Sequence, residues 1–278
     1  MTREKLVSII REKQSYLCVG LDSDPAKIPA FLNGYHDPVF EFNKAIIDQT
    51  HDLTASYKIN TAFYESNGIK GWQSLEKTIR YLDKFRNTLF TIADAKRGDI
   101  GNTSEMYAKA FLADPPYGFG FDAVTVAPYM GNDSVKPFFK YSDKWVILLA
   151  LTSNSGFEDF QKLNLDNKEQ LFERVIKQAA NWGTEQNLMY VVGATRADML
   201  LRIRQLAPDH FLLIPGVGAQ GGSLEEVSKA GLNKDAGLLI NSSRGIIFAS
   251  KDEDFADAAR AEALKIQQEM AVFLDKLR

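Results

Sequence analysis

The sequence has a single cysteine, only three histidines and no excess of basic residues. One cysteine, Cys18, cannot form a disulfide within the chain, which is typical of a reducing compartment and predicts a cytoplasmic location. The three histidines show no metal-ligand spacing, so no metal site is predicted. Because a net charge of −3 is far from the basic excess that duplex binding requires, we expect no nucleic-acid partner.

Long hydrophobic runs are also absent. No apolar stretch approaches the roughly 20 residues that span a bilayer. The first residues open an amphipathic helix, with Leu6, Ile9 and Ile10 on one side, rather than the apolar core of a signal peptide. We therefore expect no membrane association. The 278 residues are 45% hydrophobic and 25% charged, which are ordinary values for a globular protein.

The chain does contain eight short apolar runs, each followed by a polar junction and then by sequence of helical period. They lie at 16–21, 55–57, 89–93, 123–126, 145–151, 188–192, 211–214 and 238–240. Runs that are apolar throughout predict parallel strands covered on both faces. Eight such units in this length favour a (β/α)₈ TIM barrel, an α/β fold, over a doubly wound sheet. We predict one such barrel domain over residues 1–278, with an extra N-terminal helix, since no linker divides the chain.

The third run leads into the most charged junction, Asp94-Ala95-Lys96-Arg97-Gly98-Asp99. In a strand, residues two apart point to the same face, so Asp94 and Lys96 are predicted to project together. Gly98 then allows a sharp turn that directs Asp99 outward. An acid, a base and a second acid at a strand–loop–helix junction are typical of catalytic machinery, although three charges in six residues are also compatible with a surface ion-pair network.

The following residues predict the start of a helix. Asn102 is expected to cap it, with Glu105 three positions on in capping-box spacing. Thr103 is open to two interpretations, a capping residue or a substrate contact.

Polar residues end the other predicted strands as well. Barrel enzymes carry their chemistry on the loops at the carboxyl ends of the strands. We therefore expect one common mouth lined by Asp22, Lys58, Asp94, Lys96, Asp99, Ser153, Thr195, Gln220 and Arg244.

Residues 216–221 match the pattern G-x-G-x-x-G between a predicted strand and a helix. Dinucleotide binding is disfavoured because the motif lies in the seventh unit and the next strand ends in Asn-Ser-Ser-Arg at 241–244 rather than in an acidic residue. Barrels commonly hold a phosphate on the loops after strands seven and eight. Glycine N–H groups, a helix N-terminus and the Arg244 guanidinium suit a phosphate dianion, so a phosphate site is predicted here.

Three stretches together, at 94–103, 215–222 and 241–244, resemble the orotidine 5′-phosphate decarboxylase family. The resemblance is closest to its longer bacterial branch, which also shows stretches like those at 62–65 and 192–195. The motifs fall in the family's order and span residues 17–245. Ser155 and Ile59 stand where that branch usually has proline, which concerns the local backbone more than the chemistry. The resemblance implies a (β/α)₈ homodimer that converts orotidine 5′-monophosphate (OMP) into UMP without a metal or organic cofactor.

The same resemblance implies roles for individual residues. Lys58, Asp94, Lys96 and Asp99 match the family's alternating catalytic array, in which Asp99 serves the partner subunit's site. Substrate contacts are implied for Asp22 at the ribose, Ser153 at the pyrimidine, Gln220 and Arg244 at the phosphate, Thr103 across the dimer interface, and Pro215 and Gly218.

The chemistry of these residues is consistent with this reaction. Loss of carbon dioxide from C6 of the pyrimidine leaves a poorly delocalised carbanion. The Lys96 ammonium would stabilise it and then protonate it, which is worth most in a dry site. Asp94 would lie beside the departing carboxylate, and Lys58 and Asp99 would keep the array near neutrality.

Two other functions remain open from the residues alone. A metal-dependent phosphosugar aldolase or synthase of related barrel type also presents an Asp-x-Lys-x-x-Asp pattern, and it would require magnesium. A barrel without catalytic activity could instead bind a phosphorylated ligand as a sensor. Such a sensor has no need of the complete Lys58, Asp94, Lys96 and Asp99 set.

Overall fold

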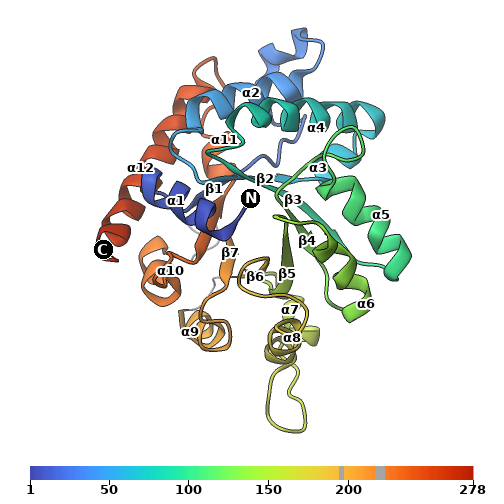
Figure 1. The fold of residues 1–278 in the computed structure, drawn as a ribbon. Coiled ribbons are helices and arrows are strands. Elements are labelled where there is room, and N and C mark those ends of the chain that lie inside the picture. The colour runs from blue at the N-terminus through green and yellow to red at the C-terminus, as the bar shows by residue number, and fades with distance from the viewer. Residues whose placement is uncertain (194–196, 217–222, 278) are drawn as a thin grey trace.

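In the computed structural model, parallel strands close into an eight-stranded barrel (Figure 1). The structure describes residues 1–193, 197–216 and 223–277. Each strand pairs with the next in chain order, and the last pairs back with the first. The strands are β1 (Leu17–Gly20), β2 (Ser56–Asn60), β3 (Phe90–Arg97), β4 (Ala123–Val126), β5 (Trp145–Leu151), β6 (Leu188–Val192), β7 (Phe211–Pro215) and β8 (Leu238–Ser242). The predicted α/β fold class and TIM barrel are confirmed, and each of the eight apolar runs overlaps a strand.

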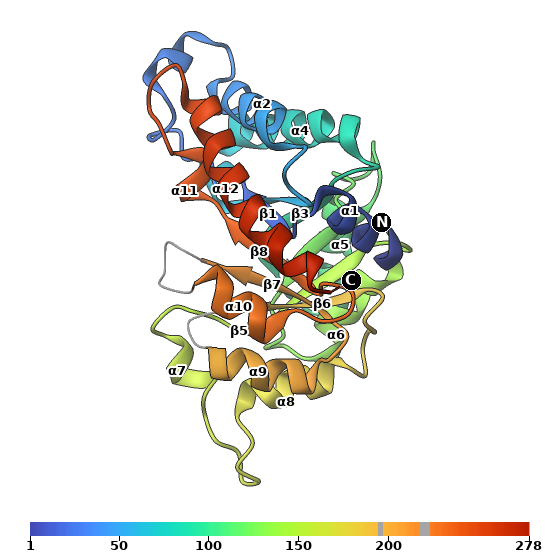
Figure 2. The same cartoon turned by 90° about the vertical axis from the view of Figure 1, so that its left-hand side faces the viewer.

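Helices alternate with the strands and surround the barrel (Figures 1 and 2). The α-helices are α1 (Arg3–Lys13), α2 (Pro38–Thr50), α3 (Ala62–Glu65), α4 (Gly68–Leu82), α5 (Gly101–Leu112), α6 (Asn132–Val135), α7 (Phe157–Phe160), α8 (Leu171–Ala179), α9 (Ala197–Leu206), α10 (Leu224–Gly231), α11 (Arg244–Ile247) and α12 (Phe255–Asp275). Short 3₁₀ helices are η1 (Ala30–Gly34), η2 (Asp83–Phe85) and η3 (Lys136–Lys140). No helix in the described ranges is long and apolar enough to cross a membrane.

The predicted N-terminal helix, α1, packs at the amino ends of the strands. Its Arg3 guanidinium donates to the backbone oxygens of Glu185 and Asp209, which precede β6 and β7. The amino end of the barrel is thereby closed, and the carboxyl ends of the strands are left as the open mouth.

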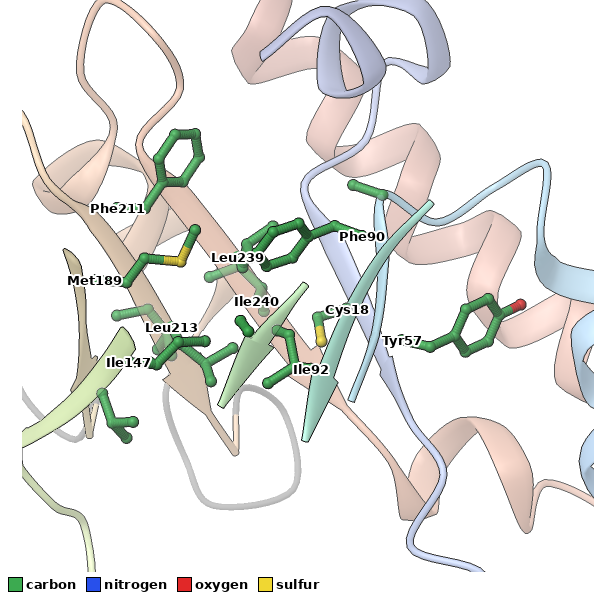
Figure 3. Packing of buried hydrophobic residues seen from close by; sticks show 14 of the residues in the cluster. Cys18, Tyr57, Phe90, Ile92, Ile147, Met189, Phe211, Leu213, Leu239 and Ile240 are labelled. Atoms are coloured by element: carbon green, nitrogen blue, oxygen red, sulfur yellow. The ribbon is translucent and has the colours of Figure 1, made fainter. Parts of the chain in front are cut away.

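The inside of the barrel is filled by side chains from alternate strands. Phe90 of β3, Trp145 of β5 and Phe211 of β7 form one layer, with Trp145 edge-on to both phenyl rings at centroid distances of 6.1 and 6.3 Å. Ile92 and Ile147 fill the interior toward the carboxyl ends (Figure 3). Because this packing is continuous, the barrel is a core rather than a pore, and polar chemistry is confined to its mouth.

Two helix starts show how capping works in this chain. Asp37 caps α2 by accepting the Phe40 N–H, with proline at the first helical position. Asn102 does not cap α5, which begins one residue earlier at Gly101. The residue that flanks the helix is Ile100, which makes no side-chain cap. The Asn102 side chain instead accepts the N–H of its neighbour Thr103 from inside the first turn, and the Ser104 hydroxyl accepts the N–H of Asp99.

Because of His210, in the turn before β7, we expect the stability of the fold to decrease in acid. Both of its ring nitrogens are buried without a hydrogen-bond partner among the described residues. Burial lowers its pKa to about 4. The guanidinium groups of Arg3 and Arg204 act in the same direction, and the carboxylates of Glu185 and Asp209 oppose them. Between that pH and the ordinary value near 6.5, the unfolded chain binds more protons than the folded one, so stability falls as the pH is lowered through this window.

We expect His210→Gln to lose less stability on acidification than the wild type. From pH 7 to pH 4.5, the wild type should lose about 2 kcal/mol more free energy of unfolding than the variant. Urea unfolding at both pH values measures the difference. Equal losses in the two proteins would contradict the prediction.

Candidate active site

A cleft of about 470 Å³ opens at the carboxyl ends of the strands. It is lined by residues that end β1, β2, β3, β7 and β8. Among the predicted site residues, it contains Asp22, Lys58, Asp94, Pro215 and Arg244. Residues from distant parts of the sequence therefore share one cavity, as the barrel predicts.

Four charged side chains, Asp22, Lys58, Asp94 and Lys96, form a continuous chain of ion pairs at this end of the barrel. The Lys58 ammonium donates to Asp94 Oδ2 at 2.9 Å and to Asp22 Oδ1 at 3.2 Å. The Lys96 ammonium donates to the other oxygen of Asp94, Oδ1, at 2.6 Å. Asp94 thus lies between two lysines from neighbouring strands, and the predicted proximity of Asp94 and Lys96 is confirmed.

The electrostatics keep this array charged. Burial opposes ionisation of Asp94, but the ammonium groups of Lys58 and Lys96 outweigh it and hold the pKa of this carboxyl well below its usual range. Burial likewise opposes the charge on Lys58, yet Asp94 and Asp22 raise the pKa of this ammonium above its ordinary value. The site therefore holds paired opposite charges, and the buried Lys58–Asp94 pair is the one that water screens least.

The two lysines differ in accessibility. The Lys58 side chain is 6% exposed, whereas that of Lys96 is 49% exposed. The Lys96 ammonium is therefore accessible from solvent although it does not line the cleft, while Lys58 is committed to the two carboxylates.

Lys96 reaches Asp94 by a backbone route that strand alternation does not describe. Between the pairs Ala93↔Val124 and Arg97↔Val126, three residues of β3 face one residue of β4. Within this bulge, Lys96 has a left-handed backbone with φ of 47°, an uncommon conformation for a residue other than glycine. The bulge therefore redirects the lysine at the end of the strand, a device that often occurs beside active sites.

Asp99 lies apart from the other members of the predicted array. Its carboxylate accepts the N–H of Ile100, and its own backbone exchanges hydrogen bonds with the Ser104 hydroxyl. In the described part of the chain it forms no ion pair with Lys58 or Lys96. One chain thus brings together Lys58, Asp94 and Lys96 but leaves Asp99 turned outward.

The remaining predicted residues do not join the ion pairs of this array. Thr103 is half-buried in the first turn of α5, and Arg244 is exposed at the start of α11. Ser153 follows β5 beside Gly193, where an added β-carbon would lie 2.6 Å from the Ser153 backbone nitrogen. Only glycine permits this close approach of the two loops.

Part of the predicted phosphate site lies outside the described residues. Gly218 and Gln220 fall in the segment 217–222, and Thr195 falls in 194–196. The described flank of the first segment consists of Pro215, which ends β7, and Gly216, which has a left-handed φ of 81°. Both line the cleft next to Arg244.

Sequence reasoning did not single out three residues at the mouth. Asn60 lines the cleft two positions after Lys58, so the alternation that selected Lys96 could also have selected it. Asn241 lines the cleft from β8, and its buried Oδ1 has no partner among the described residues. Thr125 contacts both Asp94 and Lys96 from β4. Nothing in its apolar surroundings distinguishes it from a core residue.

Comparisons with known proteins agree with this geometry. The model of the orotidine 5′-phosphate decarboxylase / HUMPS family matches residues 15–259. Orotidine 5′-phosphate decarboxylase of Flavobacterium johnsoniae is 60% identical over 275 residues, 99% of each chain, and that of Christiangramia forsetii is 58% identical over 277 residues, the full length of both. Among solved structures, the OMP decarboxylase of Leishmania donovani is similar with a TM-score of 0.82 and 37% identity, covering 98% of each chain.

Proposed function

The chain belongs to the orotidine 5′-phosphate decarboxylase / HUMPS family, and on this premise we infer that it is an enzyme that decarboxylates OMP to UMP. The observation that carries the inference is the Lys58–Asp94–Lys96 array at the mouth of the barrel. The two alternatives, a metal-dependent phosphosugar aldolase and a non-catalytic binding barrel, gain no support from relatives that share more than half of their residues with this chain.

We propose that Lys96 performs the central step. Cleavage of the bond between C6 and the carboxylate leaves its electron pair on C6, where an ammonium group lowers the energy of the developing anion and then donates a proton to it. The accessibility of Lys96 and its contact with Asp94 support this role. Asp94 lies beside the departing carboxylate, and Lys58 holds Asp94 in its charged form. Asp22 contacts the ribose and Ser153 the pyrimidine.

The phosphate is proposed to bind at the loops after β7 and β8. Arg244 is exposed at the cleft, next to Pro215 and Gly216, and its guanidinium suits a dianion. Gly218 and Gln220 complete this proposed group. Because the phosphate lies far from the bond that breaks, its binding energy serves to order the site and so affects rate as well as affinity.

A homodimer with Asp99 shared between sites is proposed from the surface around that residue. Asp99 does not join the array of its own chain, and large apolar side chains are exposed at Ile100 beside it, on α5 and on the loop between β4 and α6. Met106 is 59% exposed and Tyr129 is 88% exposed, with Ile100 and Met130 also exposed. An exposed apolar surface of this kind marks an interface, and Thr103 lies within it. A cytoplasmic location and a single domain over residues 1–278 remain part of this proposal.

Loss of OMP absorbance upon addition of the purified protein tests the function. We expect full turnover in the presence of excess EDTA, with UMP as the product by chromatography. Turnover that EDTA abolishes and Mg²⁺ restores would favour the metal-dependent alternative. Binding of UMP without any turnover of OMP would favour the sensor.

A further inference from the structure

Thr125 is a fully buried residue of β4 at the point where β3 bulges. It is the one β4 residue that faces Asp94, Ala95 and Lys96 of β3. Its position therefore places a hydroxyl group where the regular ladder between the two strands is interrupted.

The Thr125 hydroxyl bonds two residues of the array at once. It donates to Asp94 Oδ1 at 3.0 Å and accepts the backbone N–H of Lys96 at 2.9 Å. A hydroxyl has one donor and can accept at its lone pairs, so both bonds form together. Since the Lys96 ammonium also bonds Asp94 Oδ1, the lysine is fixed at its backbone and at its tip around the same carboxylate oxygen.

This arrangement supports a strained element of the site. Lys96 has a left-handed backbone, which persists only where its surroundings hold it. The bond to Thr125 provides such support and also orients the Asp94 carboxylate. We propose that Thr125 is a positioning residue for the reaction, holding Asp94 and Lys96 in the geometry that decarboxylation requires. The inference rests on the proposed function.

The same strand pair provides a matched control. Thr91 lies on β3 at the opposite end, and its hydroxyl donates to Asp122 Oδ2 at 3.0 Å and accepts the Asp122 N–H at 3.1 Å. The bonding pattern is the same, a carboxylate and a backbone amide, but no residue of the mouth takes part. Any effect of losing such a hydroxyl on stability alone should appear at both positions.

The test compares Thr125→Ser with Thr125→Ala, which differ by the hydroxyl alone, and the same pair at Thr91. We expect Thr125→Ala to have a kcat about 10–100-fold below that of Thr125→Ser, because a small misplacement of reacting groups costs this much. KM for OMP and the Kd of UMP should agree within about threefold between the two variants, since the contacts that bind substrate and transition state equally are kept. At Thr91, the two variants should share one kcat within about threefold even where their melting temperatures differ.

Thr125→Val, which keeps the branched shape, replaces the alanine variant if that chain does not fold. Equal kcat values for the serine variant and for the variant without the hydroxyl would overturn the inference while leaving the proposed function intact, since the wild type would still turn over OMP. A wild type without turnover would overturn both.

Discussion

Replacing Lys96 with alanine is expected to abolish measurable decarboxylation, with a loss of at least about 10⁴-fold in kcat. A general acid alone contributes about 10²–10⁴-fold, and a preorganised charge at the developing anion contributes about 10²–10³-fold. The variant loses both contributions because one ammonium group performs both tasks. Asp94 keeps its bonds to Lys58 and Thr125, so the carboxylate stays charged and in place.

Binding separates this outcome from a collapsed site. The affinity for UMP, measured by calorimetry, should stay close to that of the wild type because the proposed ribose and phosphate contacts are intact. Lys140→Ala provides the control, since Lys140 is an exposed lysine that also pairs with a carboxylate, that of Glu105, away from the mouth. A Lys96→Ala enzyme that retains a few percent of wild-type turnover would contradict the proposed role.

The strands of this fold could be predicted because each one is a short run of apolar residues. A parallel strand buried on both faces has no polar periodicity, and eight such runs have few alternatives to a closed barrel. The predicted cap of α5 was wrong because the helix begins one residue before Asn102, so the residue that flanks it is Ile100, whose side chain cannot accept a hydrogen bond.

The site was predictable to the extent that it follows strand ends. Lys58 lies on β2, and Asp94 and Lys96 lie in the second half of the neighbouring strand β3, so their meeting could be expected from the barrel alone. The bulge could not be predicted from the sequence, because a left-handed backbone is uncommon for lysine and nothing in the sequence marks Lys96 as an exception. Thr125 was missed for a related reason: its role arises from a bulge in the neighbouring strand, and its own segment reads as buried core.

Asp99 could be selected from its spacing, but its function depends on a second chain. Within one chain its carboxylate accepts a backbone N–H and does not approach the array. If the partner subunit's site uses it, then two inactive variants should complement each other. Co-expression of Lys96→Ala and Asp99→Ala chains with different tags gives a mixed population. In a mixed dimer, one site combines both defects and the other has an intact Lys96 from one chain and an intact Asp99 from the other.

We expect this mixture to recover about a quarter of wild-type turnover per chain, because half of the dimers are mixed and half of their sites are complete. Lys96→Ala mixed with Asp94→Ala is the matched control: both residues belong to the same chain's array, so no site in a mixed dimer is complete and no recovery should occur. Tandem affinity purification confirms that mixed dimers form. Mixed dimers of the first pair without activity, or a monomer with full turnover, would rule out a site built from two chains.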